Sequence, residues 1–579
     1  MKRLVLASAL LVAMTGLSAS VMAGNSDKIT LIHIGDTHGH MLPRPNARSD
    51  STGSDEGGLA RMYTQIQQIR KQEKNTLLLQ TGDTTHGSAE AMYTRGQVMV
   101  DVLNKFGIDA FAPGNWDFVY GSERFVELFG TGSTKAPWNT VSANLFYDGE
   151  PYAAKTGQRV VPPFVIKQVG KLKVGILGLT TDRGPQVVGK SVTKGFRFLK
   201  NGDELDTEVM AQVKQLRETE KVDLLVMLSE MGLANNMRIA DKIPGIDAIL
   251  SADMHEITLK PVVSKNGTVI IEEGQDGTVM GQLALTVENG KVANWDWKLH
   301  RLTNKVKEDK KIAAMVKEAR KSFVAGPGFK QHVNPFNGTL LPRPIDTVVG
   351  YAKIPLHRTN FSHDDMPAVI EGSSSDFIAD AFRAQGNADI GSIRGFRYGT
   401  TIMPGPIKME YLYHFIPVGP MVARGTIKGS ALKAQIEGAA DGSLNPKVEN
   451  WTGGWLFGYS GVTMNMHPYA QKGARATSVR IFNKKKNDWD ALDPNADYTY
   501  ASYYYARDAD LINTIPAGNI EVVKDEKGNP LDGVEVVVRY LQSLPGKTAN
   551  PELNRIKLLM PLPPAVSGSP EVQPWRGAQ

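Results

Sequence analysis

The pattern of hydrophobic and polar positions predicts a chain of alternating strands and helices. The first apolar run covers residues 29–34 (ITLIHI), is rich in isoleucine and breaks at Gly35. A run that is apolar on both faces is typical of a buried parallel strand, and glycine lets the chain turn sharply where the strand ends. Asp36 and His38 follow directly. Because α/β sheets place their chemistry at the carboxyl ends of strands, we expect a functional site here.

Similar strand-and-loop units recur through the first half of the chain. Further strands are expected at residues 76–80, 110–112, 173–179, 222–228 and 246–250, and helices at residues 57–72, 96–106 and 204–219. This alternation predicts a layered α/β domain. Five strand ends carry oxygen or imidazole side chains: Asp36 with His38, Asp83, Asn115, Glu230, and Asp253 with His255. One polar residue after a strand is an ordinary turn former, but five such ends indicate a metal site.

A charged helix and a Pro- and Gly-rich segment divide the chain. Residues 303–323 are expected to form a connector helix, and residues 326–344 mark a domain boundary. A length of 579 residues is too great for one core and favours several domains. The expected division is a signal peptide at 1–23, a first domain at 24–302, a connector and linker at 303–344, a second domain at 345–545 and a Pro-rich tail at 546–579.

The N-terminal residues predict export. Lys2 and Arg3 precede an apolar run at residues 4–14, and small residues end at Ala23, where a signal peptidase would cut; a membrane anchor is the alternative. No other stretch is long and apolar enough to span a membrane. The chain has no cysteine, which excludes disulfides, thiolate ligands and a lipoprotein anchor. We therefore expect a protein of the periplasm or the medium, monomeric or dimeric.

Composition and charge argue against a nucleic-acid-binding protein. The formal charge of +6 falls to about +4 once Lys2 and Arg3 are removed, which is modest for this size. Basic runs such as residues 305–311 and 484–486 are interrupted or flanked by acidic and polar residues, as on solvated faces. An apolar content of 41% is that of an ordinary globular protein.

The ordered motifs GDTHGH (35–40), TGDT (81–84), GNWDF (114–118), LSEMG (228–232) and ADMH (252–255) resemble the dinuclear metallophosphoesterase domain. The resemblance is to the branch that contains 5′-nucleotidases and SoxB thiosulfohydrolases. It implies an α/β fold, a four-layer β-sandwich flanked by helices, followed by an α+β domain of the 5′-nucleotidase C-terminal type. It also implies that Asp36, His38 and His255 hold one metal. Asp83 would bridge to a second metal, held by Asn115, Glu230 and Asp253.

Three departures from the family pattern affect the chemistry. Trp116 and Asp117 follow Asn115 where 5′-nucleotidases have histidine and glutamate, and tryptophan cannot transfer a proton. Asn115, Trp116 and Asp117 remain candidate catalytic residues. His40 and His86 lie near the motifs, but we expect each to support a metal ligand or to lie at the surface rather than to donate a proton. Glu230 and Asp253 each replace a histidine of the second metal.

The replacements favour hard metals. Oxygen ligands suit manganese, magnesium or calcium better than zinc, so we expect two divalent ions, manganese first, with magnesium, calcium or a mixed pair as alternatives. Another alternative is that the second metal is weak or lost.

The second half resembles the 5′-nucleotidase C-terminal domain. Residues 371–383 are expected to form a helix, and Arg394 and Arg397 lie where family members bind substrate, in a glycine-rich loop. Guanidinium groups pair with two oxygens of a tetrahedral oxyanion, although surface arginines are common. Phe457 and Tyr459 occupy the region where nucleotidases stack a base, and core packing accounts for them equally well.

Three functional hypotheses follow. The first is an exported dinuclear-metal hydrolase, a 5′-nucleotidase-type phosphoesterase of nucleotide catabolism, in which a metal-bridged hydroxide attacks a small phosphate ester. The second is a SoxB-like thiosulfohydrolase that releases sulfate from a cysteine-bound intermediate on a sulfur-carrier protein. Residues 93–97, Trp116, 119–121 and 395–401 resemble that branch. The third is a non-catalytic binding protein on the same fold.

Overall fold

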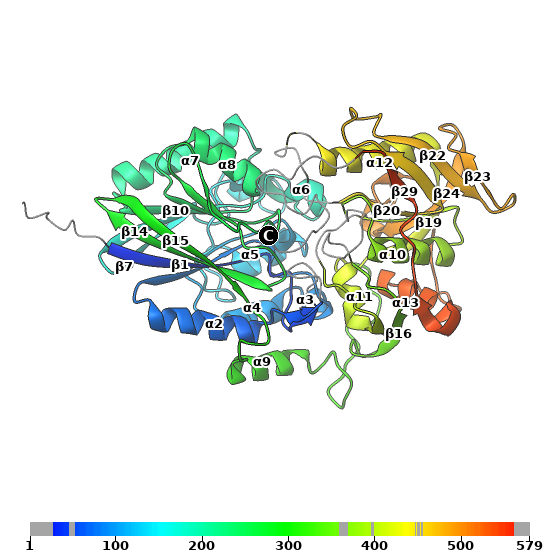
Figure 1. Cartoon of the computed structure of the whole chain (residues 1–579), viewed down its shortest axis with the longest axis horizontal. Helices are drawn as coiled ribbons and strands as arrows, with labels where there is room; N and C mark the ends of the chain where they lie inside the picture. Colours follow the sequence, from blue (N-terminus) through cyan, green and yellow to red (C-terminus); the bar gives the residue numbers. More distant parts are fainter. Residues whose placement is uncertain are drawn as a thin grey trace, which may run out of the picture.

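The computed structural model describes residues 27–45, 53–357, 369–394, 399–445, 447, 452 and 455–560. Two domains lie side by side (Figure 1), the N-terminal one in blue to green and the C-terminal one in yellow to red. The predicted signal peptide lies outside the described residues, as does Arg397. No described helix has the length and apolar character that crossing a membrane requires.

The N-terminal domain is built on two sheets. The first has the order β15 (Lys291–Arg301), β14 (Val279–Glu288), β1 (Asp27–Gly35), β4 (Thr76–Thr81) and β5 (Ala110–Ala112). The second has the order β12 (Val262–Val263), β13 (Val269–Ile271), β11 (Ala248–Ser251), β10 (Leu224–Ser229), β8 (Leu172–Leu179) and β7 (Phe164–Val169). Strands β1, β4 and β5 are parallel, and so are β8, β10, β11 and β13. Their carboxyl ends therefore meet at shared sheet edges.

Apolar residues on both faces of the strands produce four layers. Leu31 and Leu79 of the first sheet belong to the same buried cluster as Ile176 and Val226 of the second. The outer face of the first sheet is covered by α2 (Leu59–Gln72) and α4 (Gln97–Leu103). The outer face of the second sheet packs against α7 (Asp203–Lys214) and α8 (Leu233–Lys242). The predicted four-layer β-sandwich flanked by helices is confirmed.

Most predicted elements of this domain are present within a few residues of their expected bounds. The helix expected at 204–219 ends as α7 at Lys214 and continues as a π-helical turn, Gln215–Thr219. The connector helix expected at 303–323 is α9 (Lys310–Arg320). It begins later than expected because the Asp309 carboxylate caps it, accepting hydrogen bonds from the backbone N–H groups of Lys311 and Ile312.

The C-terminal domain contains a five-stranded mixed sheet with helices. The sheet has the order β20 (Gly458–Ser460), β17 (Ile390–Ile393), β24 (Asp497–Tyr504), β19 (Met421–Lys428) and β27 (Gly518–Val522). The helix expected at 371–383 is α10 (Ser373–Gln385), and α12 (Gly429–Leu444) and α13 (Gly533–Ser543) lie later in the chain. This arrangement agrees with the predicted α+β domain.

The chain after residue 545 is part of this domain's sheets. Strand β28 (Thr548–Ala549) pairs with β16 (Val348–Ala352), and β29 (Ile556–Leu558) pairs with β21 (Val462–Met466). The Pro-rich tail was expected to begin at residue 546, so the folded domain extends further than the sequence suggested. Strands β28 and β29 have two and three residues, which is too short for a hydrophobic pattern to reveal them in the sequence.

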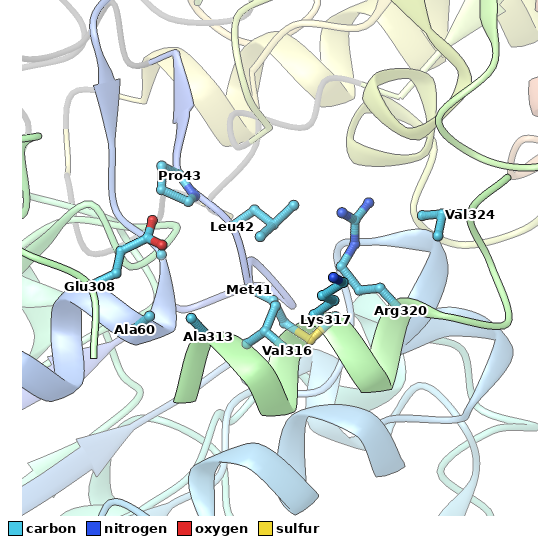
Figure 2. Close-up of a pocket in the computed structure, with 11 residues that line it drawn as sticks. Met41, Leu42, Pro43, Ala60, Glu308, Ala313, Val316, Lys317, Arg320 and Val324 are labelled. Carbon is cyan, nitrogen blue, oxygen red and sulfur yellow. The ribbon is translucent and has the colours of Figure 1, made fainter. Parts of the chain in front are cut away.

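The two domains are joined around α9. The Arg320 guanidinium pairs with Glu90 of α3 (Ala89–Tyr93), at 2.5 Å, and with Glu410 of α11 (Met409–Phe415). Arg44 also pairs with Glu410, at 2.9 Å. Residues 41–43, which follow the loop of Asp36 and His38, lie over α9 and leave a pocket of about 230 Å³ (Figure 2). The segment that follows Asp36 and His38 is thus in contact with the connector helix.

Candidate metal centre

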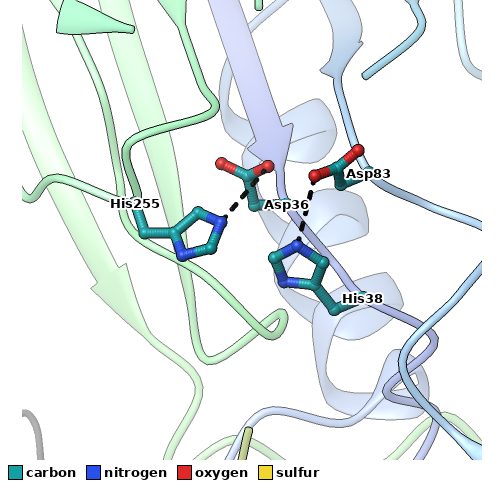
Figure 3. A group of neighbouring side chains, drawn as sticks. All are labelled: Asp36, His38, Asp83 and His255. Carbon is teal, nitrogen blue, oxygen red and sulfur yellow. Dashed lines mark ion pairs between the residues drawn. The ribbon is translucent and has the colours of Figure 1, made fainter. Parts of the chain in front are cut away.

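Four side chains from three strand ends converge on one another (Figure 3). They are Asp36 and His38 after β1, Asp83 after β4, and His255 after β11. One ligand atom of each lies within 4.8 Å of all the others. His38 Nε2 is 3.5 Å from Asp83 Oδ2, and His255 Nε2 is 3.8 Å from Asp36 Oδ1. These separations are long for hydrogen bonds and suit side chains that face a common cation.

The backbone that presents these ligands is in an uncommon conformation. The φ angles of Asp36 and His38 are both 44°, that of Asp83 is 22°, that of Asp253 is 81° and that of His255 is 57°. Residues other than glycine pay a free-energy cost there, and such strain concentrates at functional sites. Backbone hydrogen bonds from His38 N–H to Asp83 O (2.8 Å) and from Asp36 N–H to Thr81 O (3.2 Å) hold the loops together.

Glu230 enters the same site from the end of β10. A Cβ atom at Gly82 would lie 2.0 Å from Glu230 Oε2, and one at Gly114 would lie 2.3 Å from Asp83 Oδ1 and 2.5 Å from Glu230 Oε1. Only glycine leaves room for these two carboxylates to approach so closely. The glycines of the TGDT and GNWDF motifs are therefore needed because any larger residue would clash with these carboxylates.

Several buried oxygens at the site are ready for a cation. Asp36 Oδ1, Asn115 Oδ1 and both carboxylate oxygens of Glu230 have no hydrogen-bond partner within the described residues. Buried polar atoms are almost always paired, so this group fits a bound divalent ion. The donors are carboxylate and amide oxygens with two imidazoles, which is a suitable set for manganese.

The electrostatics agree with this interpretation. Burial raises the pKa of Asp36 and of Glu230 well above the usual carboxyl values, and the neighbouring carboxylates add to the effect. Burial alone would lower the pKa of His38, but the hydrogen bond to Asp276 and the nearby Asp83 carboxylate outweigh it and raise that pKa to about 10. The carboxylates of the site therefore carry more negative charge than the neighbouring side chains balance.

Asp253, expected as a metal ligand, lies at the site but is engaged by two side chains. Its Oδ1 accepts a hydrogen bond from Asn115 Nδ2 at 2.9 Å, and its Oδ2 pairs with Arg183 Nη2 at 2.5 Å. Its backbone N–H donates to Asp36 Oδ2 at 3.1 Å. Sequence reasoning missed Arg183. This residue follows β8, and no carboxylate, amide or imidazole after that strand had been singled out as a candidate ligand.

Asp276 is a second residue that sequence reasoning missed. Its Oδ1 lies 3.1 Å from His38 Nδ1 and 3.5 Å from His40 Nδ1. Its backbone N–H donates to Asp36 O at 2.7 Å. A carboxylate on the far nitrogen of a metal-binding histidine fixes its orientation. Asp276 lies in a loop before β14, where no sequence pattern pointed to a site.

Trp116 and Asp117 shape the loops of the site. The Trp116 backbone N–H donates to Asp83 Oδ1 at 2.7 Å, and the Trp116 ring stacks on His86 with centroids 4.6 Å apart. The Asp117 carboxylate accepts hydrogen bonds from the backbone N–H groups of Thr84, Thr85 and Gly114. Burial raises the pKa of Asp117 to about 6. Both side chains are buried, and the Trp116 backbone N–H and the Asp117 carboxylate hold the loop of Asp83 in place.

The two histidines considered as proton donors are buried. Burial lowers the pKa of His40, and it lowers the pKa of His86 well below the usual value. His40 Nε2 lies 3.1 Å from Thr400 Oγ1 of the C-terminal domain. Neither ring is a surface histidine, and both are held neutral near pH 7.

The residues predicted to bind substrate in the C-terminal domain differ in their burial and in their hydrogen-bond partners. Arg394 is partly buried, and its Nε donates to Asn513 Oδ1 at 3.3 Å. Tyr459 is buried in the domain core and donates to Gln435 Oε1 at 3.2 Å, which fits the core-packing alternative. Phe457 is partly exposed. No described contact joins these three side chains to the metal centre.

Comparisons with known proteins agree with this architecture. Residues 29–256 match the calcineurin-like phosphoesterase family, and residues 348–515 match the 5′-nucleotidase C-terminal domain. The N-terminal half of the chain therefore carries a calcineurin-like phosphoesterase domain, and the C-terminal half carries a 5′-nucleotidase C-terminal domain. The resemblance drawn from the motifs is confirmed, and with it the assignment to a hydrolase family.

One relative matches across both domains, and another matches over a shorter stretch. A NAD 5′-nucleotidase of Haemophilus influenzae is 25% identical over 527 residues, which cover 83% of this chain and 84% of that protein. A probable 5′-nucleotidase of Treponema pallidum is 29% identical over 249 residues, and the match spans only 40% of that relative's length.

Two solved structures from Thermus thermophilus share the fold equally. The sulfate thiohydrolase SoxB has a TM-score of 0.74 at 20% identity and covers 92% of this chain and 96% of its own. A 5′-nucleotidase precursor also has a TM-score of 0.74 at 20% identity, covering 92% of this chain and 99% of its own. At this identity the likeness concerns the fold.

Proposed function

We propose that this chain is a divalent-metal-dependent hydrolase of phosphoric monoesters, of the 5′-nucleotidase type. The observation that carries the proposal is the buried group of Asp36, His38, Asp83 and His255, gathered within 4.8 Å at the strand ends. The names of the two curated relatives, both 5′-nucleotidases, support the same reaction class. The C-terminal domain match supports a nucleotide-sized substrate.

Each residue of the group has a role in the proposed reaction. Asp36, His38, Asp83 and His255 would hold the metal, and Asn115 and Glu230 present further oxygens beside them. A bound divalent cation would lower the pKa of a water molecule and polarise the oxygens of the ester. Asp276 fixes the His38 ring through its Nδ1 atom.

The surroundings keep the site dry and rigid. None of the predicted metal-binding side chains is more than 6% exposed. The Asp83 carboxylate accepts a hydrogen bond from the Trp116 backbone N–H, and the Asp83 carbonyl accepts one from the His38 backbone N–H. These bonds hold the loop of Asp83 in place. Within a low-dielectric site, such preorganised groups stabilise developing charge more strongly than water does.

We further propose manganese as the metal and a location outside the cytoplasm. The donor set of oxygen and imidazole supports manganese, and the residues around Lys2, Arg3 and Ala23 support export.

A SoxB-like thiosulfohydrolase is the second candidate. Trp116 favours it, because this residue stands where 5′-nucleotidases have a histidine and its ring stacks on His86 instead of offering a proton. The T. thermophilus SoxB structure is also as similar in fold as the 5′-nucleotidase. Its substrate would be an S-sulfonated cysteine on a peptide.

One experiment separates these functions. The chelator-treated protein is supplied with manganese and assayed for phosphate released from nucleoside 5′-monophosphates and for sulfate released from an S-sulfonated cysteine peptide. We expect metal-dependent phosphate release, reduced at least about 100-fold by Asp36→Asn. Asp296→Asn is the control, since Asp296 is exposed on β15. Sulfate release alone would favour the second candidate, and no reaction with either substrate would contradict both.

A further inference from the structure

The second half of the metal centre contains a positive charge of the protein's own. Arg183 follows β8 and lies at the start of the short helix α6 (Gly184–Val187). Its Nη2 pairs with Asp253 Oδ2 at 2.5 Å, and the Asp253 side chain is only 4% exposed. A buried carboxylate in such contact with a guanidinium already has its counter-ion.

The other oxygen of Asp253 is also in use. Its Oδ1 accepts a hydrogen bond from Asn115 Nδ2 at 2.9 Å. The other amide atom, Asn115 Oδ1, has no hydrogen-bond partner among the described residues. Asp253 therefore acts as a support for Asn115, and its two oxygens are directed to nitrogen donors.

The donors left for a second ion are few. Without Asp253 they are Glu230, Asn115 Oδ1 and the shared Asp83, all of them oxygens. Among the described residues, the compact group of four ligands includes neither Glu230 nor Asp253. The Arg183 guanidinium contacts Asp253, which in turn contacts Asn115. A positive charge so close to these donors repels a divalent cation and weakens its binding.

We propose that Arg183 takes the place of the second metal ion, so that the centre holds one divalent ion tightly, at Asp36, His38, Asp83 and His255. Arg183 is a positioning residue, which holds Asp253 and through it Asn115. The inference rests on the proposed metal-dependent hydrolase and specifies how many ions it uses.

The test is the number of manganese ions bound per chain and their affinities, measured by titration calorimetry and elemental analysis on the full chain. For the wild type we expect one tightly bound ion. Arg183→Met should increase the affinity for a second ion at least about tenfold, because it removes the positive charge and releases Asp253. Arg183→Lys keeps the charge and should still bind one ion.

Two further variants complete the design. Arg197→Met is the matched control, since Arg197 forms an exposed ion pair with Glu204 away from the centre, and it should bind one ion. Asp253→Asn should also keep one ion, because Asp253 is not a ligand of it. This variant and the wild type remain informative if Arg183→Met does not fold.

The outcomes distinguish the inference from the function on which it rests. Two tightly bound ions in the wild type, a single ion in folded Arg183→Met, or loss of the ion in Asp253→Asn would each overturn the inference and leave a metal-dependent hydrolase in place. No bound ion in any protein would overturn the proposed function and the inference together.

Discussion

At the scale of single residues, the centre is a balance between buried carboxylates and the cations that neutralise them. Glu230 is 1% exposed, and neither of its oxygens accepts a hydrogen bond within the described residues. Burying an ionised carboxylate without a partner costs several kcal/mol or more, so such a residue persists only where something binds it. A divalent cation bound among these carboxylates would offset that cost for the groups that it contacts.

Asp276 should control how tightly the metal is held. Asp276→Asn removes the charge opposite His38 Nδ1 but keeps a side chain that tolerates the φ angle of 58° at this position. We expect manganese affinity to fall about 10-fold to 100-fold, measured by calorimetric titration. Asp296→Asn, on the exposed face of β15, should leave the affinity unchanged. Equal affinities in both variants would show that Asp276 does not orient the histidine.

Sequence reasoning found the candidate ligands but not the residues that support them. Asp36, His38, Asp83 and His255 could be found because each follows a buried strand, and parallel strands end at one edge. Arg183 and Asp276 could not, since their roles depend on contacts with residues 70 and 238 positions away in sequence. The engagement of Asp253 by an arginine was therefore invisible before the fold was known.

At the scale of elements, α9 is more than a spacer. The Arg320 side chain, 13% exposed, pairs with Glu90 of the N-terminal domain and Glu410 of the C-terminal domain. These two carboxylates are 4% and 3% exposed. Arg44 also pairs with Glu410, whereas Glu90 has Arg320 as its described ion-pair partner. Loss of Arg320 would therefore leave Glu90 buried without a counter-charge.

Arg320→Met should destabilise the protein substantially. Removing one partner of a buried ion pair typically costs about 3–5 kcal/mol, because a charge remains buried alone. The measurement is urea unfolding, with Lys317→Met on the exposed face of the same helix as the control. We expect the control to change stability by less than about 0.5 kcal/mol. If both variants unfold at the same urea concentration, the ion pairs of α9 contribute nothing to stability.

Sequence periodicity located several buried strands but missed others, since β13 and β14 are also largely buried and were not expected. β4 and β5 lie within a residue of their expected bounds, because nearly every position is apolar and buried. β15 was not predicted, since it lies at the sheet edge and most of its residues are exposed or only half-buried. An edge strand needs no hydrophobic pattern to pair with its neighbour.

At the scale of the whole molecule, a chain of polar contacts links the two domains beside the metal loop. His40 Nε2 lies 3.1 Å from Thr400 Oγ1, and Thr400 Oγ1 lies 2.9 Å from His414 Nδ1. The two imidazole rings are 4.4 Å apart at their centroids. Burial lowers the pKa of both histidines, that of His414 well below its usual value.

This junction should make stability sensitive to mild acid. A lowered pKa means that the unfolded chain binds more protons than the folded chain below about pH 6.5. Stability is then complete above that pH and decreases as the pH falls through it, by up to about 1.4 kcal/mol per pH unit for each histidine.

The measurement is urea unfolding of wild type and His414→Gln at pH 7.5, 6.5 and 5.5. Between pH 6.5 and 5.5 the wild type should lose about 1 kcal/mol more than the variant, since glutamine does not titrate. Parallel losses in the two proteins would rule out His414 as a source of the pH dependence.

The central claim is that the buried strand-end residues form a metal centre, and metal content tests it most directly. The purified wild type and Asp83→Ala are incubated with manganese, separated from free ions and analysed for bound metal. The account predicts at least one tightly bound divalent ion per wild-type chain and none in Asp83→Ala. A wild-type chain without metal after this treatment, or equal metal in both proteins, would contradict it.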